Sequence, residues 1–418
     1  MTGQTPAADP YRSVAEQYVK LVLAVGQHDG DYVDAFYGPP EWRKDAESAK
    51  QPLATIDAHA AKTETQLAAL PMPAVKGPDA ELWTLRRQYL TRQLAALRSR
   101  VAMLQGRKYT FDDESKALYD AVAPAIPESE FQVVLKQLSA TLPGEGSLID
   151  RYDRYKAGFV IPKSRVDRVF QEAIRACRGR MPSVQLPLKE RFTVEYVTNK
   201  SWSAYNWYQG DFKSLIQVNT DLPIYIDRAV DLACHEGYPG HHVYNVLLEK
   251  TLVKDRGWLE YTVYPLFSPQ SLIAEGTANY GIEVAFSPAD RVRFESDVLF
   301  PIAGLDPEKV AEYYAVLALV DRLSYAGNEA ARQFLDGKID RAAAVAWLER
   351  YAMYAKPHAE HRVKFIEQYR SYVINYNLGK DLVRAYVERK MGRDRTPLRR
   401  WSEFMALLSS PRLPSGLK

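Results

Sequence analysis

Hydrophobic positions recur three and four residues apart along most of the chain, which is the period of an α-helix. This pattern runs from Tyr11 to about Asp29 and again from Leu82 to Leu104. In the second stretch the apolar positions are Leu82, Leu85, Tyr89, Leu90, Leu94, Leu97, Val101 and Leu104. Proline-rich segments at residues 38–40, 70–73 and 124–127 separate the helical stretches. The pattern therefore predicts helices whose apolar stripes face a common core.

Around residue 191 the pattern changes from a helical period to alternation. Residues 192–197 alternate and are rich in β-branched and aromatic side chains, and two similar runs, 205–208 and 214–219, lie on either side of Gly210-Asp211. We expect a small antiparallel β-sheet over about residues 191–220. Two interpretations of it remain open: an edge strand on which an extended peptide pairs, or a hairpin that only covers the core.

After residue 275 the helical pattern returns and continues to the C-terminus. The predicted fold class is therefore mainly α, a large helical body with a small antiparallel sheet. By length we expect an N-terminal helical region, residues 1–165, and a second region, residues 166–418, that together form one continuous bilobal body.

Composition is that of an ordinary globular protein, with 46% apolar and 26% charged residues. The net charge of +3 favours no nucleic-acid partner. The sequence contains no run of 18 apolar residues, so we expect no membrane span. The N-terminus lacks a signal-peptide pattern. A cytoplasmic location is expected, with a removed export signal as the alternative.

Cys177 and Cys234 are too few for a disulfide scaffold, and we expect Cys234 to pack in the core. The pattern specifies no oligomeric state.

The segment DLACHEGYPGHH, residues 231–242, contains three of the seven histidines of the chain, His235, His241 and His242, and Glu236 directly follows the first. Neutral imidazoles bind zinc, and a nearby carboxylate accepts a proton from water. On a straight helix, however, His241 would lie about 120° around the axis from His235. His242 would lie roughly 10.5 Å along the axis, too far to share a metal.

Between these histidines stand Gly237, Tyr238, Pro239 and Gly240. Proline lacks the backbone N–H, and its ring pushes against the carbonyl four residues earlier, that of His235. We therefore predict a bulge that loops residues out of the helix. With two residues looped out, His241 regains a one-turn relation to His235; with three, His242 does. His241 is the preferred metal ligand and His242 the fallback.

Read with this bulge, the segment resembles the His-Glu-x-Gly-His core of gluzincin metallopeptidases of the thimet oligopeptidase and thermostable carboxypeptidase type. The string HEGYPGHH resembles the signature of the bacterial family "domain of unknown function 885", over roughly residues 191–390. The resemblance implies a metallopeptidase-like body and a Zn2+ cofactor held by His235, His241 and a glutamate on a later helix. Glu275, in SLIAEGTANY, occupies the matching position. A Tyr-x-x-Gly element maps onto Tyr376 and Gly379, without the Pro-Gly-Gln run that usually precedes it.

The resemblance further implies a zinc-dependent hydrolase that cleaves peptide bonds, with Glu236 as the general base. Tyr376 is expected to donate a hydrogen bond to the oxyanion. We expect Arg370, His242 and Tyr280 to contact the substrate, a peptide or small amide. Arg370 has two open interpretations: it pairs with a substrate carboxylate, or it forms a structural ion pair with a residue such as Glu367.

Two other functions remain open from the sequence. One is a metal-dependent amidohydrolase that acts on a non-peptide amide, because the chemistry at the carbonyl is the same. The other is a non-catalytic binding protein on the same scaffold. His358 and His361 lie about one helical turn apart, so they could bind a second metal. Without a neighbouring acidic motif, we favour surface or substrate-pocket positions for both.

Overall fold

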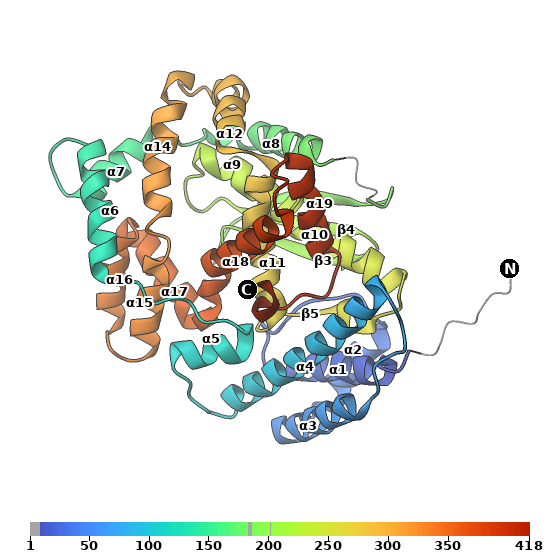
Figure 1. Cartoon of the computed structure of the whole chain (residues 1–418). Coiled ribbons are helices and arrows are strands. Elements are labelled where there is room, and N and C mark those ends of the chain that lie inside the picture. Colours follow the sequence, from blue (N-terminus) through green and yellow to red (C-terminus); the bar gives the residue numbers. More distant parts are fainter. Residues whose placement is uncertain (1–8, 183–185, 201) are drawn as a thin grey trace.

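The computed structural model describes residues 9–182, 186–200 and 202–418, and helices dominate it (Figure 1). The α-helices are α1 (Arg12–Val25), α2 (Pro40–Ala49), α3 (Leu53–Ala69), α4 (Pro78–Leu104), α5 (Phe111–Tyr119), α6 (Glu128–Thr141), α7 (Leu148–Ala157), α8 (Val166–Arg180), α9 (Ile226–Leu232), α10 (His241–Leu248), α11 (Pro269–Ala285), α12 (Pro288–Phe294), α13 (Phe300–Ala303), α14 (Val310–Asp321), α15 (Ala326–Leu335), α16 (Arg341–Tyr351), α17 (Lys356–Tyr369), α18 (Ile374–Met391) and α19 (Pro397–Leu408). The strands are β1 (Val33–Phe36), β2 (Arg191–Val197), β3 (Ala204–Gly210), β4 (Lys213–Asn219) and β5 (Val263–Pro265). The prediction of a mainly α fold with a small β component is confirmed. None of the described helices combines the length and apolar character needed to cross a membrane.

The two helices with the clearest apolar period form as expected. α1 lies within the predicted stretch, and α4 covers the whole of Leu82 to Leu104. Leu90, Leu94 and Leu97 of α4 are completely buried, because positions three and four residues apart lie on one face of a helix. Proline in the first turn of α2 and of α4 suits the helix start, where no N–H partner is lost.

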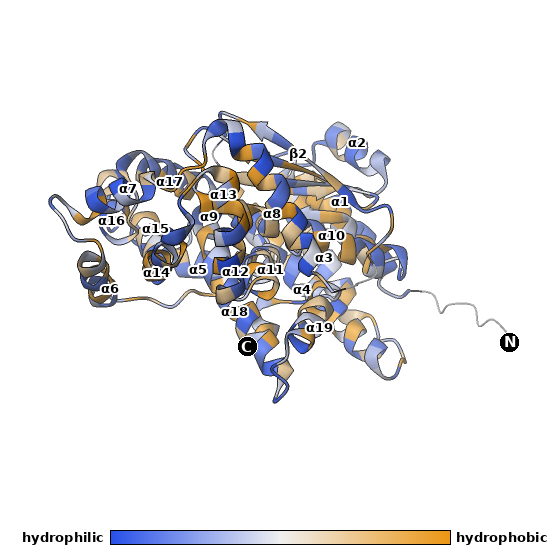
Figure 2. Cartoon of the chain, turned by 90° about the horizontal axis from the view of Figure 1, so that it is seen from above, coloured by the Kyte–Doolittle hydropathy of each residue, from blue (hydrophilic) through white to orange (hydrophobic). Residues whose placement is uncertain are grey.

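Buried side chains form two hydrophobic clusters. The larger cluster lies among α1, α3, α4, the sheet, α8–α11, α18 and α19. The smaller one joins α6 and α7 to α14–α17, which lie together on the left of Figure 1. Hydrophobic residues are mixed with polar ones along the outer helices in Figure 2, as expected for helices that bury one face. Thus α6 and α7, which precede residue 166, pack with helices from the second half of the chain.

The three-stranded sheet lies where the alternating pattern predicts it, but its strand directions are mixed. Its order is β2-β4-β3, with β3 antiparallel and β2 parallel to β4. The tight turn at Asp211 and Phe212, both with positive φ, joins β3 and β4 as a hairpin. β2 pairs with β4 on its other side and runs parallel to it. The expectation of a purely antiparallel sheet was wrong. β1 and β5 form a separate antiparallel pair that the sequence did not predict.

Two glycines let α11 and α18 cross at very short range. A Cβ placed on Gly276 would lie 2.5 Å from the backbone carbon of Gly379, closer than real Cβ atoms approach. A Cβ on Gly379 would lie 2.8 Å from the carbonyl oxygen of Leu272. Only glycine allows this crossing without a shift of one helix. It places Tyr372, just before α18, beside Glu275, the neighbour of Gly276.

Candidate metal centre

Three predicted ligands from two separate segments come together. The Nε2 atoms of His235 and His241 are 3.1 Å apart. Oε2 of Glu275 lies 3.3 Å from Nε2 of His235 and 3.7 Å from Nε2 of His241. Among the described residues, these three form the one group of His, Cys, Asp or Glu side chains that could hold a metal ion.

The chemistry of these donors fits a zinc ion. Ligands bonded at about 2.0–2.2 Å in a tetrahedral site are separated from one another by about 3.3 Å. The three separations, 3.1, 3.3 and 3.7 Å, bracket that value. Oε2 of Glu275 is buried and has no hydrogen-bond partner among the described residues. A buried carboxylate oxygen requires a donor or a cation, so the residues present fit the metal.

A π-helical turn brings His241 to His235. Residues Ala233–Gly237 are π-helical, the N–H of Tyr238 donates to the carbonyl of Ala233, and that of Gly240 donates to the carbonyl of Cys234. α10 then begins at His241. The structure thus has a bulge between the two histidines, as the proline and glycines suggested. A Cβ on Gly240 would lie 1.8 Å from the carbonyl oxygen of His235, so this turn accepts only glycine there.

Asn279 orients His235. Nδ1 of His235 lies 3.0 Å from Oδ1 of Asn279, which accepts a hydrogen bond from it, so Nε2 keeps its lone pair for a metal. The amide nitrogen of Asn279 donates to the carbonyl oxygen of Tyr376 at 3.1 Å, which fixes the direction of the amide. Asn279 lies one turn after Glu275 on α11, so both point to the same side of that helix.

The surroundings of Glu275 favour its anionic form, which is the form that binds a metal. Burial alone would raise the pKa of this carboxyl group, but its contacts with His235 and His241 hold the pKa well below its ordinary value. Its second oxygen, Oε1, accepts a hydrogen bond from the hydroxyl of Tyr372 at 2.8 Å. One oxygen is therefore positioned by the protein while the other faces the two imidazoles.

Glu236 is 5% exposed and lies next to His235 in the π-helical turn. Burial raises the pKa of its carboxyl group to about 7, with His241 opposing and Glu275 adding to the rise. The side-chain amide of Asn206, on β3, donates to the backbone carbonyl of Glu236 at 2.8 Å. The sheet therefore supports the turn that carries the expected general base.

His242 lies outside the cluster and is completely buried. Its Nδ1 is 2.8 Å from Oγ of Ser214, and its Nε2 is 2.9 Å from Oε2 of Glu190. Tyr238 donates to the same oxygen of Glu190 at 2.8 Å. Both ring nitrogens of His242 are thus used to join β4, the turn and the segment before β2. This geometry offers no nitrogen of His242 to a metal or substrate.

The other expected substrate contacts are placed differently. Arg370 pairs with Glu114, its Nε 2.6 Å from Oε2, and Glu114 also accepts from the N–H and hydroxyl of Ser371. Its partner is therefore a buried acid from α5 rather than Glu367. Tyr280 is 2% exposed, and its ring packs edge-on against Phe404 of α19. Tyr376 is only partly buried, with its ring 5.8 Å from that of Tyr372.

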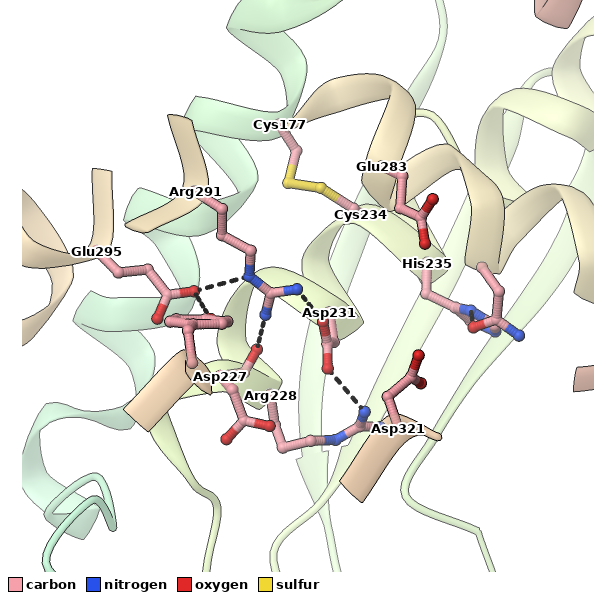
Figure 3. Close-up of polar contacts among 12 residues, drawn as sticks. Cys177, Asp227, Arg228, Asp231, Cys234, His235, Glu283, Arg291, Glu295 and Asp321 are labelled. Atoms are coloured by element: carbon pink, nitrogen blue, oxygen red, sulfur yellow. Dashed lines mark hydrogen bonds and ion pairs between the residues drawn. A yellow bond between two sulfur atoms is a disulfide. The ribbon is translucent and has the colours of Figure 1, made fainter. Parts of the chain in front are cut away.

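A disulfide joins Cys177 of α8 to Cys234 of the π-helical turn (Figure 3). Cys234 is completely buried in the core, as expected, and the disulfide is an additional bond that the sequence did not predict. The two residues are 57 positions apart, and packing of α8 against the turn brings their Cα atoms to 5.6 Å. Arg291 of α12 also contacts this segment, with Asp231 at 2.7 Å and the carbonyl of Asp227 at 2.8 Å. The segment before His235 is thus fastened from two helices.

A further acid that no sequence motif marks, Asp34, lies near the cluster. Asp34 on β1 accepts a hydrogen bond from the hydroxyl of Tyr205 on β3. Burial, and then the charges of Glu275 and Glu236, raise its pKa to about 8. Asp34 precedes Glu275 by more than two hundred residues, and no local pattern marks it. His358 and His361 join no metal-binding group within the described residues.

No protein-family model matches the chain, and no curated protein matches it. Several solved structures are similar in fold. The M32 carboxypeptidase from Deinococcus radiodurans R1 is 14% identical with a TM-score of 0.47, over 96% of this chain and 89% of the other. The carboxypeptidase from Pyrococcus furiosus is 12% identical with a TM-score of 0.48, over 96% and 87%. A protein from Colwellia psychrerythraea, described as a candidate lipoprotein, is 12% identical with a TM-score of 0.49, over 87% of this chain. This chain spans 65% of that protein's length. The resemblance to "domain of unknown function 885" stays a prediction.

Proposed function

We propose that this protein is a zinc-dependent hydrolase that cleaves peptide bonds. The observation that carries the proposal is the cluster of His235, His241 and Glu275, which has a separation suited to zinc and a buried carboxylate oxygen without a partner. Glu236, buried beside the cluster, supplies the carboxylate that such a reaction requires. A purely structural zinc site usually has four protein ligands, whereas this group has three.

Zinc, when bound, acts as a Lewis acid that polarises the substrate carbonyl and lowers the pKa of a water molecule. The remaining roles belong to the chain. Glu236 accepts a proton from the attacking water and then donates it to the leaving amine. Asn279 and Tyr372 hold His235 and Glu275 in position, and Tyr376 donates to the oxyanion.

A peptide is the preferred substrate because β3 forms one edge of the sheet and contacts the site directly. Asn206 of β3 holds the carbonyl of Glu236, so a chain paired along this strand would run beside the expected base. Main-chain hydrogen bonds along an edge strand favour an extended peptide over a small amide. A matched panel of short peptides and N-acyl amides separates the two substrate classes.

The disulfide also bears on the compartment. Such bonds are rare in cytosolic proteins and persist in oxidising environments. The Cys177–Cys234 bond therefore favours an oxidising compartment over the cytoplasmic location expected from the sequence. Mass spectrometry of the protein from its native host, after alkylation without a reductant, would test this directly.

The experiment that tests the function measures zinc content and peptide hydrolysis together. His235→Ala should lose the metal and all hydrolysis, whereas His59→Ala, an exposed histidine on α3, should keep both. His241→Ala should lose the metal, while His242→Ala should weaken folding before it affects zinc binding. A zinc content near one per chain in His235→Ala would refute the site. A zinc-loaded wild type that hydrolyses no peptide would refute the function.

A further inference from the structure

Basic residues from three helices gather around His358. They are Lys156 at the end of α7, Arg228 on α9, and His361 and Arg362 on α17. Desolvation, and then the charges of Arg362, Lys156, His361 and Arg228, lower the pKa of His358. His358 itself is solvent-exposed, and its ring stacks on Tyr354 at 4.3 Å. Several basic side chains therefore lie near a histidine that solvent reaches.

Most of these basic side chains already interact with an acidic or aromatic partner. Arg228 pairs with Asp231 at 3.0 Å, and Lys156 lies 3.8 Å above the ring of Tyr225. Arg362 is different. Its Nε is buried and has no hydrogen-bond partner among the described residues. A buried guanidinium nitrogen requires an acceptor.

Arg362 lies over two aromatic rings, and one of them neighbours the residues of the metal cluster. Its guanidinium carbon lies 4.8 Å from the ring of Phe365 and 5.6 Å from that of Tyr376. The ring of Tyr376 is in turn 5.8 Å from that of Tyr372, whose hydroxyl donates to Glu275. Tyr376 therefore lies between Arg362 on one side and the metal cluster on the other. An extended peptide covers about 3.3–3.6 Å per residue, so a few residues would reach from the metal cluster to Arg362.

We propose that Arg362 binds a carboxylate of the substrate beside the metal centre. The proposal rests on the function proposed above and names a chemical feature of its substrate. The planar guanidinium pairs with a carboxylate through two parallel hydrogen bonds, and the rings of Phe365 and Tyr376 hold it flat. Arg370, which Glu114 neutralises, cannot serve this purpose.

The carboxylate has two possible sources, the free C-terminus of a peptide or the side chain of an acidic residue near the cleaved bond. Three peptides of otherwise equal sequence separate them. The first has a free C-terminus and no acidic side chain, the second is the same peptide amidated, and the third is amidated but carries glutamate in place of glutamine. The peptide that Arg362 recognises identifies the source.

Binding is measured by calorimetry with zinc-loaded protein that carries Glu236→Gln, so that the peptides survive. Turnover is measured with Glu236 intact. Arg362→Met keeps the apolar stem and removes the charge, while Lys364→Met removes an exposed charge from the opposite side of α17. We expect Arg362→Met to weaken binding of one carboxylate peptide by about 10–100-fold, as for the loss of a charge-assisted pair. Binding of the amidated peptide should change less than threefold, and Lys364→Met should match the parent. Arg362→Lys should restore binding only in part, because lysine lacks the planar fork.

The two proposals fail in different ways. Equal losses for the carboxylate and amidated peptides in Arg362→Met, with zinc content and circular dichroism unchanged, would overturn the carboxylate site while leaving the peptidase intact. If Arg362→Met fails to fold, Arg362→Gln supplies the second variant, and an unchanged preference for carboxylate peptides there would overturn the site. Carboxylate-selective binding without turnover of any peptide would support the site and refute the hydrolase.

Discussion

Replacing Gly240 with alanine should remove the metal without touching a ligand. The added Cβ would lie 1.8 Å from the carbonyl oxygen of His235 and 2.5 Å from that of Cys234. Since ordinary contacts of this kind are 3.4–4 Å, the backbone of His235 must move by roughly 1.5 Å. Metal–ligand distances tolerate only about 0.2 Å. The imidazole of His235 would therefore leave the position in which it faces His241 and Glu275.

The expected loss of zinc affinity exceeds the roughly 10–100-fold that follows removal of an outer hydrogen-bond partner. Overpacking should also lower the free energy of unfolding by about 1–3 kcal/mol. Competition with a chromophoric zinc chelator measures the affinity, and circular dichroism checks that the helices persist.

Gly327→Ala is the matched control for this prediction. Gly327 lies inside α15, and a Cβ there meets no atom within 4 Å. Alanine at this helical position should raise stability by about 0.5–1 kcal/mol and leave zinc binding unchanged. If Gly240→Ala bound zinc as tightly as Gly327→Ala, the argument that the tight turn positions His235 would be refuted.

Four other substitutions give distinct results. Glu236→Gln should keep its zinc and lower turnover by about 10²–10⁴-fold, whereas Glu275→Gln should lose zinc; the reverse pattern, seen by metal analysis and kinetics, would exchange their roles. Cys177→Ser should lower the free energy of unfolding by about 4 kcal/mol, the loop-closure value for residues 57 apart. Urea denaturation measures it against Ser48→Ala, a change at an exposed position of α2. Arg370→Ala should cost about 3 kcal/mol because it leaves Glu114 buried and unpaired, with no change in the preference between free and amidated peptides; a lost preference would restore Arg370 as a substrate contact.

The sequence predicts the helices well because their apolar stripes are long and regular. It also predicts that the helix is interrupted between His235 and His241, because Pro239 and the neighbouring glycines disfavour a regular helix there. The number of looped-out residues depends on how closely Gly240 approaches the carbonyl of His235, which is a tertiary contact. For that reason the pattern alone left His241 and His242 as alternatives.

Other parts of the site carry a weaker local signal or none. Asn279 follows Glu275 by one helical turn, so its position beside the cluster was readable from the sequence. Asp34 reaches the site from β1, a four-residue strand without a distinctive pattern. The pairing of two cysteines, and the parallel direction of β2 to β4, depend on how distant segments pack. Such contacts arise only when the whole chain has folded.

The disulfide and the proposed zinc meet at adjacent residues, Cys234 and His235. One cross-link ties this point back to α8, and the other would tie it forward to Glu275 on α11. Two closed loops of the chain would then share a single peptide bond as their junction. Because neither loop can open there without displacing the other, reduction of the sulfur bond and removal of the ion become coupled events. Reduction of the disulfide should therefore speed the loss of zinc, and removal of zinc should speed reduction of the disulfide.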